Sequence, residues 1–169
     1  VRWLWASHAV HHSATRLNFT AGIRLGWGGG LTGGLLFYLP LPLIGFEPLA
    51  VGIMLSANLG YQFFLHPAVA PNLGLLEWVL NTPRHHHVHH AANETCIDRN
   101  FGGTLIVFDR LFGTFAKPPE DEPLKFGIAG TGRISENPLR ILTFEWLRMF
   151  RDLKTHPKRW WKVLFGAPV

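Results

Sequence analysis

The stretch that decides the fold is Thr82-Pro83-Arg84-His85-His86-His87-Val88-His89-His90. Threonine is a favourable N-cap residue and proline suits the first helical position, so the sequence predicts a helix that begins at Pro83. Within that helix, His86, His89 and His90 follow the spacing His-x-x-His-His. Positions i, i+3 and i+4 share one face of a helix, so three imidazoles are expected to project to the same side.

The same spacing occurs near the start of the chain, at His8, His11 and His12. Residues 1–20 are predicted to be helical, so this triplet is also expected to occupy one helix face. Two such helices that face each other would supply six imidazole nitrogens. A tetrahedral zinc ion needs four ligands, so the pair of triplets predicts two metal ions.

Histidines in this number and spacing favour a metal centre over a purely structural histidine cluster. Neutral imidazole is a good ligand for iron, zinc and copper. Clustered histidines repel one another once they are protonated and cost desolvation when they are buried, whereas a bound cation requires them to be neutral. His66 lies where an apolar run ends and is a further candidate ligand, while His156 is expected to be exposed and structural.

Polar residues near the triplets are candidates for contacts that orient the histidines. Metal-bound imidazoles commonly donate their second N–H to a carboxylate or a carbonyl. Asp98, Asn100 and Asp109 follow the second triplet and are candidates for this role. Their alternative role is capping and turn formation beside the neighbouring glycines. Asn18 is either a polar partner of the site or a residue at the end of a helix.

The length and the cysteine content limit the class of protein. One domain is expected for 169 residues. Cys96 is the single cysteine, which excludes a disulfide framework and a thiolate zinc site. The sequence starts at Val1 rather than at methionine and shows no secretory signal pattern, so we expect a piece of a longer protein, truncated at its N-terminus.

Positive charge is absent from a long central part of the chain, where the only carboxylates are Glu47 and Glu77. No Lys or Arg lies between Arg24 and Arg84, and this part contains two apolar runs within 31–65. Each run is shorter than the about 20 residues that usually span a bilayer, so together they predict a hairpin that crosses or re-enters a membrane. A buried hairpin of a soluble protein is the alternative. The glycines within 26–30 predict a bend, since no Gly-Lys-Ser/Thr phosphate-loop motif follows them.

The C-terminal part of the chain is basic. From Lys117 onward it holds ten Lys/Arg and six Asp/Glu residues, which account for most of the net charge of +5. A basic tail beside an uncharged stretch indicates the cytoplasmic side of a membrane protein. No basic cluster with a nucleic-acid-reading motif is present, so nucleic acid is not an expected partner. Asn137-Pro138 predicts the start of a helix that is either interfacial or an ordinary amphipathic surface helix.

Taken together, these motifs resemble the fatty acid hydroxylase/sterol desaturase superfamily, and the likeness covers nearly the whole chain. The segments that carry the resemblance are His8-Ala9-Val10-His11-His12-Ser13, Gln62-Phe63-Phe64-Leu65-His66, Asn81 to His90, Ile97-Asp98-Arg99-Asn100-Phe101-Gly102-Gly103 and Phe108-Asp109-Arg110-Leu111-Phe112-Gly113-Thr114-Phe115.

The resemblance implies an integral membrane enzyme that holds two iron ions and uses O2 and an external electron donor. Its reaction would be hydroxylation or desaturation of a C–H bond in a sterol, a fatty acyl chain or a related lipid. The ligands that it implies are His8, His11, His12, His66, His86, His89 and His90, with His85 as a further candidate.

The fold that we expect is all-α, a membrane-embedded helical bundle in one domain over 1–169. It comprises a transmembrane or re-entrant hairpin at 31–65, a cytosolic histidine-rich metal-binding cap at 66–115 and a basic tail at 116–169. The cap and tail are expected on the cytoplasmic side, where the basic face would dock an acidic electron-transfer protein or reductase.

The chain departs from the family pattern in three places. It lacks an earlier His-x(3–4)-His box, it has His87 where close relatives commonly have arginine, and Pro67-Ala68 follow His66 where the family often has threonine and glutamate. The missing box predicts further ligands upstream in the full-length protein. A non-catalytic or degraded metal-binding membrane protein is the alternative function. A zinc hydrolase is disfavoured because no glutamate lies inside either triplet.

Overall fold

The computed structural model describes residues 1–24, 32–131 and 135–167. Within these ranges the chain is helical, as predicted, and holds two isolated β-bridges and no strand. The predicted bend at 26–30 and the first residue of the predicted hairpin lie outside the described residues. The α-helices are α1 (Arg2–His12), α2 (Phe19–Gly22), α3 (Pro40–Leu43), α4 (Pro48–Phe63), α5 (Pro83–His90), α6 (Val107–Phe112), α7 (Pro138–Thr155) and α8 (Trp160–Phe165). The short 3-10 helices are η1 (Gly34–Tyr38), η2 (Gly74–Trp78), η3 (Glu94–Cys96) and η4 (Pro157–Arg159).

The first helix is shorter than the predicted span of 1–20. α1 ends at His12, where the Ser13 hydroxyl donates to the Val10 carbonyl over 2.6 Å. A new helix, α2, then begins after Asn18, whose side chain accepts a hydrogen bond from the Thr20 backbone N–H at 2.9 Å. The Asn18 side chain therefore caps a second helix, and the chain turns between the two.

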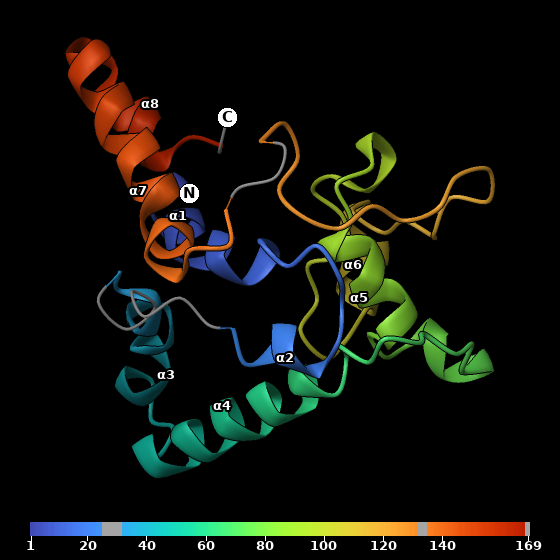
Figure 1. The fold of residues 1–169 in the computed structure, drawn as a ribbon. Helices are drawn as coiled ribbons and strands as arrows, with labels where there is room; N and C mark the ends of the chain where they lie inside the picture. Colours follow the sequence, from blue (N-terminus) through green and yellow to red (C-terminus); the bar gives the residue numbers. More distant parts are fainter. Residues whose placement is uncertain (25–31, 132–134, 168–169) are drawn as a thin grey trace.

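Helix α7 packs against α1, and the two helices are joined by buried charges. Figure 1 shows α7 at the upper left, with α1 next to its first turns and α8 beside it. The Arg2 guanidinium donates to Glu145 at 3.3 Å and to Asp152 at 2.6 Å. Arg2 and Glu145 are 2% and 1% exposed. As predicted, α7 starts at Asn137-Pro138, and the Asn137 side chain accepts from the Leu139 N–H.

The predicted hairpin at 31–65 folds as η1, α3 and the 16-residue helix α4. Prolines begin α3 and α4, and the Glu47 carboxylate caps α4 by accepting from the Ala50 N–H at 2.7 Å. None of the residues of η1, α3 or α4 is buried, although most are apolar. Among the helices that the structure describes, none is both long and apolar enough to cross a bilayer.

Helix α5 begins at Pro83, as the sequence predicts. The Thr82 hydroxyl does not cap it and is buried without a hydrogen-bond partner. The helix is fixed instead by Asn100, whose side-chain amide donates to the carbonyls of His85 at 3.0 Å and Ala116 at 2.9 Å. Asn100 thus ties α5 to the loop that follows α6.

Candidate metal centre

Seven histidines from distant parts of the chain meet between α1, α5 and the residues just after α4. The structure divides them into two groups, and the ligand-type atoms within each group lie within 4.8 Å of one another. The first group is His11, His66, His86 and His90, and the second is His8, His12 and His89. These are the seven residues for which the sequence predicts a ligand role, and their proximity is what that role requires.

Each His-x-x-His-His triplet is split between the two groups. In α1, His8 and His12 are four residues apart and belong to the second group, whereas His11 belongs to the first. In α5, His86 and His90 belong to the first group, whereas His89 belongs to the second. Residues i and i+4 are stacked along one helix face, and residue i+3 is offset around it. The spacing therefore places histidines of both groups on one pair of helices.

The first group is centred on His66. Its Nε2 atom lies 3.0 Å from Nε2 of His11 and 2.9 Å from Nε2 of His86. His90 Nε2 is 3.2 Å from the same atom. Nitrogen ligands held about 2.1 Å from one metal ion, at right angles to each other, would be separated by about 3 Å. The four nitrogens are therefore spaced as ligands of one cation would be.

In two of these rings, the hydrogen bond made by Nδ1 shows which of the two ring nitrogens carries the proton. Nδ1 of His11 contacts the Ala21 carbonyl oxygen at 2.9 Å, and Nδ1 of His66 contacts the Gln62 carbonyl oxygen at 2.8 Å. A carbonyl oxygen can only accept, so each Nδ1 carries the proton and each Nε2 of the neutral ring presents a lone pair. Two lone pairs 3.0 Å apart repel, and a cation between them relieves that repulsion.

The second group also has closely spaced Nε2 atoms and a ring held by a backbone carbonyl, and it is more exposed than the first group. Nε2 of His8 lies 3.1 Å from Nε2 of His12. His89 donates its Nδ1 proton to the Arg99 carbonyl at 3.1 Å, which leaves the lone pair of its Nε2 for a metal. His8 is exposed, whereas His12 is buried. This group can therefore hold a metal and still be reached from outside.

Burial keeps these imidazoles neutral near pH 7. Desolvation, followed by the positive charge of His66 when that ring is protonated, lowers the pKa of His11 to about 4. The pKa values of His12, His86 and His90 are lowered well below 6.5, first by burial and then by neighbouring histidines. Metal binding requires the unprotonated ring, so no proton has to be displaced from these nitrogens at neutral pH.

The polar residues predicted to orient the histidines mainly organise the backbone around them. The buried Asp109 carboxylate accepts from the N–H groups of Phe101 at 2.7 Å and Gly102 at 2.8 Å, and from the Thr114 hydroxyl at 2.6 Å. Asn100 holds α5, and Asn18 caps α2. The hydrogen bonds that orient ligand-type histidines come from backbone carbonyls, which polar side-chain patterns do not reveal.

Asp98 differs from these residues because it stands at the edge of the second group. It is exposed, has a positive φ of 56° and lines the same cavity as His89. A role for it as a partner of the metal centre stays a prediction.

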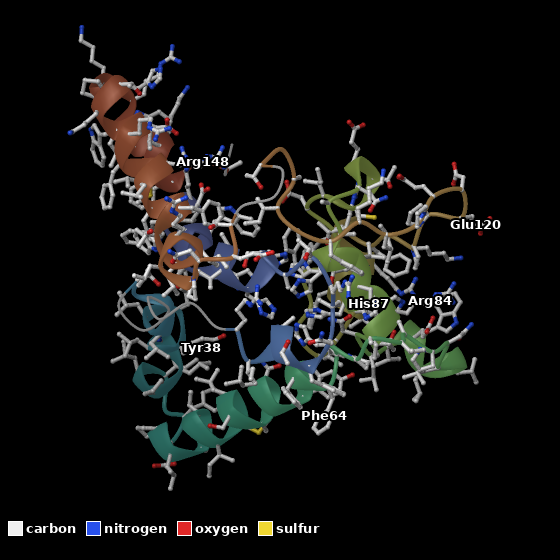
Figure 2. The ribbon with its side chains drawn as sticks, in the orientation of Figure 1. Tyr38, Phe64, Arg84, His87, Glu120 and Arg148 are labelled. Carbon is white, nitrogen blue, oxygen red and sulfur yellow. The ribbon has the colours of Figure 1, made fainter. Side chains whose placement is uncertain are left out.

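Two further histidines of α5 lie outside both groups. Nε2 of His85 faces the Glu77 carboxylate at 3.9 Å, and the ring meets Phe115 edge-on. His87 donates from Nε2 to the Pro67 carbonyl at 2.9 Å and so holds the residue next to His66. The sequence does not indicate this role for His87, which Figure 2 shows on α5.

A cavity of about 640 Å³ opens onto the histidines. Rings from both groups line it, and Leu4, Trp5, Ile97 and Phe101 contribute apolar walls. Sites for small molecules commonly combine such a volume with apolar walls and a few polar groups. The arrangement can therefore bring an apolar molecule close to a pair of metal ions.

Several known proteins are similar to this chain. Alkylglycerol monooxygenase of Xenopus tropicalis is 42% identical over 135 residues, which are 76% of this chain and 28% of that protein. Alkylglycerol monooxygenase of Danio rerio is 39% identical over 157 residues, 87% of this chain and 33% of that protein. Ornithine lipid hydroxylase of Rhizobium tropici is 34% identical over 128 residues, 75% of this chain and 38% of that protein.

The chain spans only about a third of the length of these relatives. No solved structure matches it. The family model described as fatty acid hydroxylase matches residues 1–114, which include both histidine triplets and His66. The chain therefore belongs to the fatty acid hydroxylase family.

Proposed function

We propose that this chain carries the metal centre of a membrane-bound lipid hydroxylase that uses O2 and two iron ions. The observation that carries the proposal is the pair of histidine groups, in which three rings donate Nδ1 protons to carbonyls and hold their Nε2 lone pairs for a metal. The seven histidines are the proposed ligands, with four for one ion and three for the other. The group of three leaves the more open position, because its residue His8 is exposed.

The overall reaction combines a lipid C–H bond, O2, two electrons and two protons, and yields the alcohol and one water. Two bound iron ions would supply the activation of O2 that this reaction requires. The protein supplies fixed nitrogen ligands and a cavity whose apolar walls, including Trp5 and Phe101, exclude water from the reacting carbon. Because rings of both groups line this cavity, a lipid chain inside it would lie beside the metals.

Hydroxylation is the proposed outcome, rather than desaturation. The relatives are a monooxygenase of alkylglycerols and a hydroxylase of ornithine lipids. Both names describe insertion of oxygen into a lipid, so we propose an ether-linked or acyl glycerolipid or aminolipid as the substrate. Sterols have no comparable support among these relatives.

The remaining parts of the chain are proposed to serve membrane attachment and electron supply. The segment 31–65, which contains no Lys or Arg and has no buried residue in its helices, is proposed to lie in the membrane. Exposed basic residues of the tail, such as Arg151, Lys154 and Lys158, are proposed to dock an acidic electron-transfer protein on the cytoplasmic side.

The test uses the full-length protein in lipid nanodiscs, loaded with iron and supplied with a reductant and, in separate samples, an alkylglycerol, an acylglycerol and an ornithine lipid. We expect O2 consumption and an alcohol product that carries one atom from isotopically labelled O2. His89→Ala should abolish the product, whereas His156→Ala, at an exposed position outside both groups, should leave it unchanged. Full iron loading of the wild-type protein without oxidation of any of the three lipid classes would refute the proposal.

A further inference from the structure

Helix α6 has its charged and apolar residues reversed relative to a helix that faces water. Phe108, Leu111 and Phe112 are 54%, 73% and 74% exposed. Its two charged residues turn inward. Asp109 is 2% exposed and bonds to the backbone of the preceding loop. The guanidinium of Arg110 lies over the Phe115 ring at 3.8 Å.

The 3-10 helix η2 shows the same reversal. Leu75, Leu76 and Trp78 are exposed, with Leu75 at 85%. The one charged residue of η2, Glu77, turns its carboxylate back to accept from the Leu73 N–H at 3.1 Å and approaches His85. In both elements the charged side chains contact other parts of the protein, and the apolar side chains are exposed on its surface.

The two elements form one continuous surface. The Arg110 guanidinium donates to the Glu77 carbonyl at 3.0 Å and lies 4.9 Å from the centre of the Trp78 ring. Behind them, the Ile106 N–H donates to the Val79 carbonyl at 3.0 Å. The exposed apolar residues of this surface, called the α6 surface below, are Leu75, Leu76, Trp78, Phe108, Leu111 and Phe112.

The α6 surface is continuous with the uncharged helix α4. The Tyr61 hydroxyl donates to the Asn81 carbonyl at 2.6 Å, and the Thr104 hydroxyl donates to Asn58 at 2.7 Å. These bonds fix the end of α4 to the segments that lead out of η2 and into α6. No Lys or Arg lies between Arg24 and Arg84, so α4 and η2 carry none of the cations that a water-facing or acidic-partner surface would carry. The one cation of α6, Arg110, is bound to the Glu77 carbonyl and the Phe115 ring.

We propose that the α6 surface is immersed in the lipid at the membrane–water boundary. This inference rests on the proposed membrane location of the enzyme. A bilayer is favoured over a protein partner because the outward residues are uniformly apolar, their charges turn away, and Trp78 is of the type that gathers at membrane interfaces. Part of the region expected to be a cytosolic cap, 66–115, then lies in the membrane.

The position of this surface has a consequence for the substrate. Phe101 is 57% exposed and lines the cavity beside the histidines, and its ring centre lies 6.0 Å from that of His89. The segment that begins at Phe101 leads directly into α6. A lipid can thus pass from the bilayer into the cavity beside Phe101 without crossing water.

The test places a fluorescent label on single cysteines in a Cys96→Ser background of the full-length protein. The labelled variants are Leu111→Cys and Leu75→Cys, and the control is Glu120→Cys, whose native side chain is exposed on an outlying loop (Figure 2). The proteins are placed in phosphatidylcholine nanodiscs with or without brominated acyl chains. Iodide, which quenches only from water, is added separately.

We expect brominated lipid to reduce emission at positions 111 and 75, and iodide to have little effect there, with the reverse result at position 120. Quenching of 111 and 75 by iodide would overturn the inference. Protection from both quenchers would overturn it too, since protein would then cover the surface. Lipid oxidation is measured on the same samples, so loss of turnover with lipid quenching retained would refute only the proposed function.

Discussion

Replacing His66 tests whether the two histidine groups are separate metal sites. His66→Ala removes the ring that stands at the centre of the first group, where its Nε2 lies 2.9–3.2 Å from the other three nitrogens. The second group has no member in the segment that holds His66. We therefore expect this variant to lose one metal ion and to keep the other.

The size of the effect follows from the number of nitrogens that remain. The first group falls from four ligands to three. Losing only an outer contact of a metal ligand typically costs 10–100-fold in metal affinity, so loss of a ligand should cost at least about 100-fold, or about 2.7 kcal/mol. His12→Ala should have the complementary effect, because it removes a ligand from the second group alone.

The assay is a metal titration of the full-length protein, with the bound iron counted by elemental analysis. His66→Gln, which keeps most of the side-chain volume, controls for a cavity left by alanine, and His156→Ala controls for a histidine outside both groups. If His66→Ala and His66→Gln bind as much metal as the wild type, and with the same affinity, the assignment of His66 as a ligand is wrong.

Three further results are expected. Arg2→Ala leaves the buried Glu145 carboxylate without one of its partners and should lower the free energy of unfolding by about 3–5 kcal/mol in denaturant titrations; an unchanged midpoint would show that the pair is dispensable. Asp109→Asn puts an amide where the carboxylate accepts two backbone N–H groups. This change should loosen the Arg99 carbonyl that orients His89, and should weaken metal binding at the second group about 10–100-fold. An unaltered metal affinity would contradict this prediction. Chelation at pH 7 should lower the melting temperature, since metal present at 1,000 times its dissociation constant stabilises by about 4 kcal/mol; melting that is indifferent to the chelator would contradict the account.

Much of the candidate site follows from local rules. The α5 helix could be predicted because Thr82-Pro83 is a common helix start, and a shared helix face follows from the spacing of each triplet. All seven histidines predicted as ligands lie in the two groups. His85, in contrast, lies outside them beside Glu77, because the i−1 position turns it away from the shared face.

The features that could not be predicted depend on long-range packing. The division of each triplet between two groups depends on where His66 enters, which helix periodicity does not specify. The Arg2–Glu145 pair joins residues 143 positions apart. The carbonyls that accept from His11 and His89 belong to backbone that any sequence has, so no side-chain pattern marks them. The turn after His12, which shortens the predicted helix, depends on the cap formed by Asn18.

It remains a prediction that segment 31–65 forms a hairpin in the membrane. Segment 31–65 is as apolar as expected, but its prolines divide it into short helices, and α4 has 16 residues. Most of the apolar residues of α4 are exposed, and none of them is buried. Attachment through several short apolar elements, including the α6 surface, agrees with this arrangement.

The most direct measurement of the central claim is Mössbauer spectroscopy of the iron-loaded, oxidised full-length protein. The two groups stand side by side, with the rings of His12 and His90 stacked at a centroid distance of 4.3 Å. Two ferric ions held there should couple magnetically and give the diamagnetic ground state of a dinuclear centre. A spectrum of isolated, uncoupled ferric ions, or stable binding of only one iron, would contradict the account.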